Sequence, residues 1–315
     1  MQIRPGQIRI AVAAAAVVFL FSCAGGPVRT DPPHMTGGTQ QIALGNSAYK
    51  QGCHNAALRS YYRAYELYSA SDQPAGVAMS LNNLGNVYRA LGEPANALKY
   101  FGEAGVLYAR SGDRQGLRQV LANKAAALMD LGSLDLAEKA LAEAGKVDLP
   151  DNAGFLPLII DRGILLTRRG DFQAAEKILD AAVAKSPTDT TGAPDAAAAH
   201  YAMGRLKMET GQFKTAAGYF QAALKADQAS GFYAGMADDL QRLGDAYSRM
   251  GEPDAALDYW KRSVRIYALT GQKQETGAVL QKLKAEAART GASLDVVEAF
   301  VRNCREGRDP DRLCN

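Results

Sequence analysis

Few side chains in this sequence are placed for catalysis or metal binding. The chain has 3 histidines and 4 cysteines, and none of them shows the H-x-x-x-H or C-x-x-C spacing of a metal site. No glycine-rich phosphate-binding loop occurs, and no pattern brings serine, histidine and aspartate together. We therefore expect neither an enzyme nor a bound cofactor or metal, and the cysteines are left as the residues with chemistry to explain.

The first cysteine, Cys23, directly follows a short apolar segment. Arg4 and Arg9 precede an apolar run of 12 residues, Ile10 to Phe21, which is too short to span a bilayer comfortably. A positive start, a short apolar run and a small residue before the end are typical of an export signal.

The tetrapeptide LFSC that ends at Cys23 resembles the lipobox of bacterial lipoproteins. The resemblance implies that residues 1–22 are a signal peptide, and that the thiol of Cys23, as the nucleophile, is alkylated with a diacylglycerol. Ala24 in the next position implies the outer membrane, with the protein facing the periplasm. The alternatives are an ordinary cleaved signal with an incidental cysteine, or a buried helix.

The residues after the lipobox and the other cysteines give further expectations. Residues 23–38 are rich in glycine and proline without a helical period, which predicts a flexible tether.

Export places the remaining cysteines in an oxidising compartment, and we predict a disulfide between Cys304 and Cys314 that holds the polar tail, 305–315. Cys53 is then left over, either as a turn residue or paired with a partner or a second copy.

A glycine recurs about every 40 residues along the chain. An alanine lies five residues after each of the first six, and a bulky apolar residue lies four residues further on. The glycines are Gly52, Gly92, Gly132, Gly170, Gly211, Gly251 and Gly291. A fixed period of this size is typical of a stack of identical supersecondary units.

Each unit has the pattern of two helices. Between Ala78 and Gly112, apolar residues recur at helical spacing on both sides of Gly92, and Pro94 suits the first turn of the second helix. A small residue lies seven before each turn glycine, and we expect it to face the alanine after the turn, where two helices cross closely. These small residues are Gly45, Gly85, Ala125, Gly163, Gly204 and Gly244.

The motifs L-G-x-x-Y around Gly85 and A-x-x-x-F ending at Phe101 resemble the tetratricopeptide repeat (TPR). The resemblance implies an all-α fold, a right-handed superhelical solenoid of antiparallel helix pairs. We assign six units to residues 39–275. We assign a degenerate capping pair to residues 276–304, because Lys284 and Val296 replace the small residue and the alanine there.

The first helix of each unit is expected to line the concave face, which solenoids use for binding. In units one to three this face carries asparagines, whose amides both donate and accept hydrogen bonds with an extended peptide. These are Asn46, Asn82, Asn83, Asn86 and Asn123, and units five and six present Tyr201, Arg205 and Arg242. The alternative is that these side chains only bond neighbouring helices.

The nearly balanced charge of the chain argues against nucleic acid as a partner. With 36 Lys and Arg against 33 Asp and Glu, the chain has no basic field for nucleic acid. The sequence predicts a lipid-anchored scaffold or adaptor that binds a protein or peptide partner on its concave face, in the service of an envelope complex. The alternatives are a self-assembling structural lipoprotein and, less favoured, an enzyme or small-ligand sensor.

Overall fold

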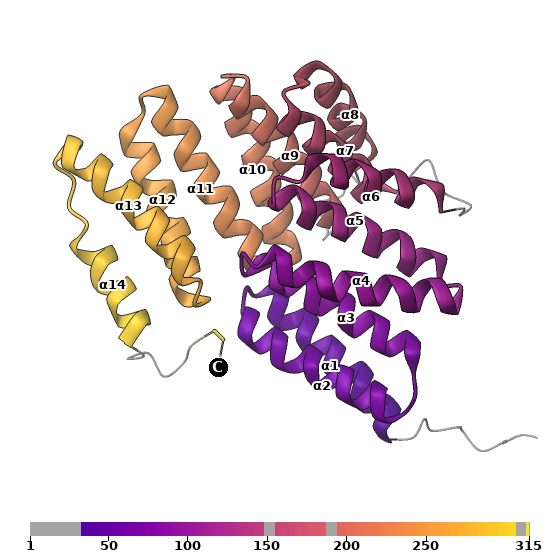
Figure 1. Cartoon of the computed structure of the whole chain (residues 1–315). Helices are drawn as coiled ribbons and strands as arrows, with labels where there is room; N and C mark the ends of the chain where they lie inside the picture. Colours follow the sequence, from indigo (N-terminus) through magenta and orange to yellow (C-terminus); the bar gives the residue numbers. More distant parts are fainter. Residues whose placement is uncertain (1–32, 148–154, 187–193, 307–312, 315) are drawn as a thin grey trace, which may run out of the picture.

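The computed structural model describes residues 33–147, 155–186, 194–306 and 313–314. Over these residues the chain forms fourteen helices and no strand (Figure 1). They are α1 (Pro33–Lys50), α2 (His54–Ala70), α3 (Pro74–Ala90), α4 (Pro94–Ser111), α5 (Arg114–Asp130), α6 (Leu134–Lys146), α7 (Leu156–Arg169), α8 (Phe172–Lys185), α9 (Pro194–Glu209), α10 (Phe213–Ser230), α11 (Tyr233–Met250), α12 (Pro253–Leu269), α13 (Lys273–Thr290) and α14 (Asp295–Glu306). The predicted signal peptide and Cys23 lie outside the described residues, and none of the described helices is both long and apolar enough to cross a membrane.

The first twelve helices pack as six consecutive pairs, α1–α2 through α11–α12. The turn glycine of every pair has a φ between 74° and 81°, a left-handed conformation that costs other residues about 1–2 kcal/mol. The glycine spacing therefore predicted the pairs correctly, and the all-α solenoid is confirmed.

The small residue in each first helix faces the bulky residue of the second helix. A Cβ atom added to Gly85 would lie 2.4 Å from Cε1 of Phe101, and one on Gly244 would lie 2.4 Å from Cδ1 of Trp260. Our expectation that the small residue faces the alanine was wrong. The bulky side chain occupies the space beside the glycine, while the alanine, such as the fully buried Ala97, lies in the core.

The folded part begins earlier than predicted. Helix α1 starts at Pro33, so the tether boundary at residue 38 was wrong. Gly38 is a helical residue, and a Cβ atom there would lie 2.7 Å from the ring of Tyr68. Glycine serves close packing here, and composition alone cannot tell this use from flexibility.

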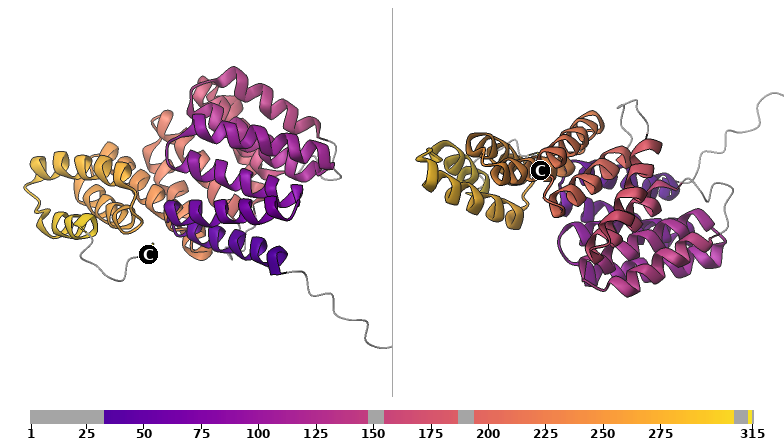
Figure 2. Two further views of the ribbon diagram at one scale, coloured as in Figure 1. Left: turned by 60° about the horizontal axis from the view of Figure 1, so that its bottom comes forward. Right: turned by 90° about the horizontal axis from the view of Figure 1, so that it is seen from above.

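The pairs curve into a superhelix with the first helices on its inner side. Consecutive first helices, from α1 to α11, contact one another, whereas consecutive second helices from α2 to α12 show no comparable contact among the described residues. The curvature brings the two ends together, so that α1 and α2 lie beside α11 and the turn before α13 (Figures 1 and 2). At this junction the ring of Tyr49 stacks on Phe232 with 6.2 Å between centroids.

A disulfide joins the two ends of the superhelix. Cys53, in the first turn, is bonded to Cys314, 261 residues away in the sequence. The predicted Cys304–Cys314 bond was wrong, and so was the view of Cys53 as a leftover residue; Cys304 is a thiol. Curvature summed over six pairs places the first turn beside the tail, which sequence spacing cannot show.

The seventh glycine precedes a helix that does not pack as a TPR second helix. Helix α14 packs mainly against α12, and its Val297 and Val301 join a core with Val279 and Leu283 of α13. Val296, at the alanine position, is 76% exposed. Helices α13 and α14 thus cover the end of the solenoid without forming a closely crossed pair.

Candidate binding surface on the concave face

Three of the five predicted asparagines are engaged within the protein. Asn46 Oδ1 accepts a hydrogen bond of 2.7 Å from the hydroxyl of Tyr61, which fixes it to its own helix pair. Asn123 Nδ2 donates to Asn82 Oδ1 at 2.9 Å and so links α5 to α3. Asn123 also accepts from Gln119 at 3.0 Å. These three side chains connect helices, as the structural alternative predicted.

The other two asparagines keep their amides available. Asn83 and Asn86, both on α3, are partly exposed. Neither makes a side-chain hydrogen bond within the described part of the chain. Each offers a donor and an acceptor to a ligand on the concave face.

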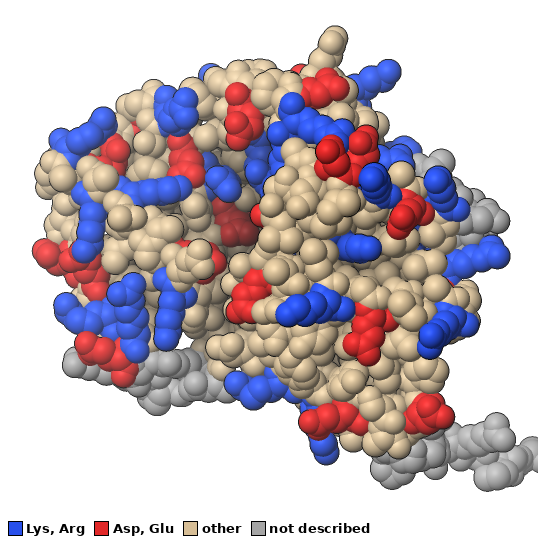
Figure 3. Space-filling model, viewed as in Figure 1, with Lys and Arg blue, Asp and Glu red and all other residues tan. Residues whose placement is uncertain are grey.

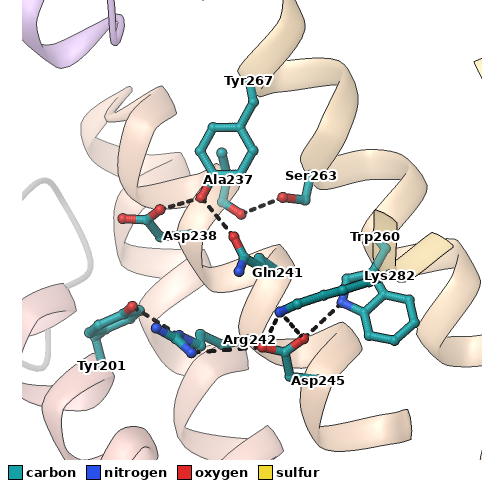
Figure 4. A network of polar contacts seen from close by, with 10 residues as sticks. All are labelled: Tyr201, Ala237, Asp238, Gln241, Arg242, Asp245, Trp260, Ser263, Tyr267 and Lys282. Carbon is teal, nitrogen blue, oxygen red and sulfur yellow. Dashed lines mark hydrogen bonds and ion pairs between the residues drawn. The ribbon is translucent and has the colours of Figure 1, made fainter. Parts of the chain in front are cut away.

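In the C-terminal half, a hydrogen bond between equivalent repeat positions links the first helices α9 and α11. Arg242 Nε on α11 donates to the hydroxyl of Tyr201 on α9 at 3.2 Å (Figure 4). The two residues are 41 apart, as are Asn82 and Asn123. The predicted residues Tyr201 and Arg242 therefore lie together, and both are partly exposed.

Asp245 holds the neighbouring helices together at this part of the surface. Its carboxylate accepts two hydrogen bonds from Lys282 Nζ, at 2.6 and 2.8 Å, and one from Trp260 Nε1 at 3.0 Å. Arg242 lies 3.7 Å from the same carboxylate. One acidic side chain thus joins α11, α12 and α13, and Figure 4 shows Arg242 held between it and Tyr201.

Arg205 has no comparable partner. It makes no hydrogen bond or ion pair within the described ranges, and it is only partly exposed. Burial lowers the pKa of Arg205, and the nearby Arg242 and Arg168 lower it further, whereas Tyr201 and Glu209 oppose the shift. A guanidinium with five donors and neighbouring positive charge is therefore available to an acceptor from outside the protein.

A charged cluster that sequence reasoning missed lies on α3, α5 and α7. Asp130 Oδ2 accepts from Arg89 Nε at 2.6 Å, and Asp130 Oδ1 lies 3.2 Å from Arg168 NH2. Burial raises the pKa of Asp161 to about 7 even though Arg89 opposes the shift. The sequence did contain a signal for this cluster. Each of Arg89, Asp130 and Arg168 lies two or three residues before a turn glycine.

Where the two ends of the superhelix meet, the interior encloses a cavity of about 280 Å³. Tyr49, Arg89 and Asp130 line it from the N-terminal half, and Asp238 and Glu275 from the C-terminal half. The space-filling view is hollowed between these two halves, with acidic side chains in its depth (Figure 3). No group of described side chains has the composition of a metal site. The inner surface is a concave polar face with both signs of charge.

Comparison with known proteins agrees with this geometry. The family model described as "Tetratricopeptide repeat" matches residues 39–104 and 195–269. These two segments are tetratricopeptide repeats. They cover most of units one, two, five and six, where the small residue is a glycine that faces an aromatic ring. No curated protein matches the chain in sequence.

Among solved structures, the chain is similar to three that were determined with a bound factor or peptide. The Rap protein in complex with competence and sporulation factor is 14% identical, with a TM-score of 0.57 over 82% of this chain and 77% of the Rap chain. The Rap conjugation regulator of plasmid pLS20, in complex with the Phr* peptide, is 13% identical, with a TM-score of 0.57 over 93% and 83%. NprR in complex with NprX is 13% identical, with a TM-score of 0.58 over 88% and 79%. At this identity the similarity shows a shared fold.

Proposed function

We propose that this protein is a lipid-anchored scaffold that binds a protein or peptide partner on its concave face, at the periplasmic side of the outer membrane. The observation that carries the binding proposal is the set of available polar side chains on the inner helices, Asn83, Asn86 and Arg205. In a surface where neighbouring polar groups are already paired, unpaired ones retain hydrogen-bonding capacity for a ligand. Similar folds were solved with peptides, namely Phr* and the cognate peptide NprX.

The chemistry of the face suits an extended segment of polypeptide. The amides of Asn83 and Asn86 match the alternating donors and acceptors of a peptide backbone. Arg205 suits a carboxylate or a backbone carbonyl. The bonded pairs Asn82–Asn123 and Tyr201–Arg242 hold the inner helices in place, so little ordering cost is added on binding.

Co-purification tests the binding proposal with two matched triple variants. The first carries Asn83→Ala, Asn86→Ala and Arg205→Ala. We expect its recovery of the envelope partner to fall about tenfold or more, because each lost hydrogen bond weakens binding by about 0.5–1.5 kcal/mol. The control carries Lys99→Ala, Lys139→Ala and Glu143→Ala, all exposed on second helices, and should recover the partner normally. Equal recovery by both folded variants would reject the inner face.

The anchoring proposal rests on Cys23 and the apolar segment before it. A diacylglycerol adds two acyl chains, which is the number that stable membrane anchoring requires. In a Gram-negative host, labelled palmitate should enter the wild-type protein, and the protein should fractionate with outer membranes. Cys23→Ser should remove the label and release the protein from the membrane fraction. Labelling that survives this substitution would overturn the anchoring proposal.

A further inference from the structure

A second cavity, of about 310 Å³, lies at the junction of the two ends, next to the disulfide. Its walls come from the start of α2, the turn between α12 and α13, the start of α13 and the end of α14. Cys53 and Cys314 both border it. The cavity thus exists only because the superhelix has curved until its ends meet, and it lies apart from Asn83, Asn86 and Arg205.

The described walls of this cavity carry several positively charged side chains. Arg59 of α2, Lys273 of α13 and Arg305 of α14 all line it, and no lining residue is acidic. None of these three cations has an ion pair in the part of the chain that the structure describes. Three like charges around one small space repel each other, and an anion between them would relieve the repulsion.

Backbone donors point to the same ligand. Helix α2 begins at His54 without a side-chain cap, because its N-cap residue is Cys53, whose sulfur is in the disulfide. The backbone N–H groups of Asn55 and Ala56 make no backbone hydrogen bond among the described residues, and both residues line the cavity. Helix α13 also begins here without a side-chain cap. The partial positive charge of a helix N-terminus favours anions.

A buried histidine also lines the cavity. His54 is 6% exposed and lines the cavity. Its ring contacts Tyr49, but its nitrogens make no side-chain hydrogen bond within the described ranges. Burial lowers the pKa of His54 to about 4, so at neutral pH the uncharged ring offers one N–H donor.

We propose that this cavity binds a phosphate group, held by Arg59, Lys273 and Arg305 and by the N–H groups at the start of α2. Arginine and lysine together with helix N-termini are the groups that recognise phosphate. A phosphate dianion matches the excess of positive charge better than a single carboxylate does, and the volume leaves room for the rest of a small phosphate ester. The phosphate could come from a soluble compound or from a lipid headgroup.

Calorimetric titration with inorganic phosphate, at constant ionic strength, tests the site. The protein is the full mature chain with Cys23→Ser, purified with its disulfide formed. We compare a double variant, Arg59→Gln with Lys273→Gln, against a control pair, Lys99→Gln with Lys139→Gln. All four side chains are exposed, so the fold should persist, and thermal melts without phosphate check this. Each charged hydrogen bond lost should weaken binding about tenfold or more, whereas the control pair should bind as the parent does.

Binding in the double variant equal to that of the parent chain overturns the proposal, and so does a parent chain that binds no phosphate. A second titration with vesicles of phosphatidylglycerol in phosphatidylcholine identifies the source. Vesicle binding that inorganic phosphate displaces and that the double variant lacks supports a lipid headgroup. Phosphate binding without vesicle binding supports a soluble phosphate compound.

Discussion

Single glycines explain both the turns and the close packing of this chain. The turn glycines adopt a positive φ, whereas glycines such as Gly85 leave room for the ring that crosses the helix. The spacing of both sets is visible in the sequence, so both could be predicted. The partner of Gly85 was predicted wrongly, because one-dimensional spacing does not show where a ring lies across a helix.

Substitution of Gly85 tests this packing. Gly85→Ala places a Cβ atom 2.4 Å from the ring of Phe101, and overpacking of this kind costs about 1–3 kcal/mol. Gly102 is a matched control on α4, since a Cβ atom there meets nothing within 4 Å and alanine favours a helix by about 0.5–1 kcal/mol. Thermal melts should show a lower Tm for Gly85→Ala and an equal or higher Tm for Gly102→Ala. If neither variant has a lower Tm than the wild type, the proposed packing is contradicted.

On the first helices, the repeat register predicts which helix carries each polar residue but does not show its hydrogen bonds. All eight predicted residues lie on first helices, yet only Asn83, Asn86 and Arg205 keep their polar groups available. Whether an asparagine faces a ligand or a neighbouring side chain depends on sub-ångström placement of the next helix. This distinction is what the structure adds at the scale of residues.

At the scale of helices, the seam between α10 and α11 breaks the repeat. Sixteen residues after the turn glycine, units one, two and six have Tyr68, Tyr108 and Tyr267, whereas unit five has Asp227. Asp227 lies beside the buried Asp239 of α11. Burial raises the pKa of Asp227 to about 7, and burial together with the charge of Asp227 raises that of Asp239 to about 9.

This carboxyl pair makes stability depend on pH. The folded state holds protons that the unfolded chain, with carboxyl pKa values near 4, has already released. The pair therefore costs little free energy below about pH 4. It destabilises the fold progressively from there up to about pH 9, above which the cost is constant.

The substitution Asp239→Asn removes one of the two ionisable groups and should change this dependence. The Tm of the variant relative to wild type should increase steadily from pH 5 to pH 9 in thermal melts, because the amide never has to be protonated to remain buried. Asp180→Asn, an exposed position on α8, should show no such trend. A Tm difference that is constant with pH would show that the pair does not control the dependence.

At the scale of the whole molecule, the superhelix closes, in the sense that its two ends meet. This closure determines which disulfide and which cavities the protein has. Closure forms the Cys53–Cys314 bond, the interior cavity and the cationic cavity at the junction. The sequence predicted the helix pairs of the first six units, because these depend on local spacing. It did not predict closure, since the total curvature sums small rotations at every interface between units. The wrong cysteine pairing has the same origin.

The central claim is that a partner binds inside this superhelix, and photo-cross-linking in cells tests it most directly. A photoreactive residue replaces Asn86 on the inner helix α3 or, as a control, the exposed Lys99 on the outer helix α4. The predicted result is one adduct of defined mass from position 86 that is absent from position 99 and whose yield falls with Arg205→Ala. Adducts that are identical from both positions, or that form only from position 99, would contradict binding on the concave face.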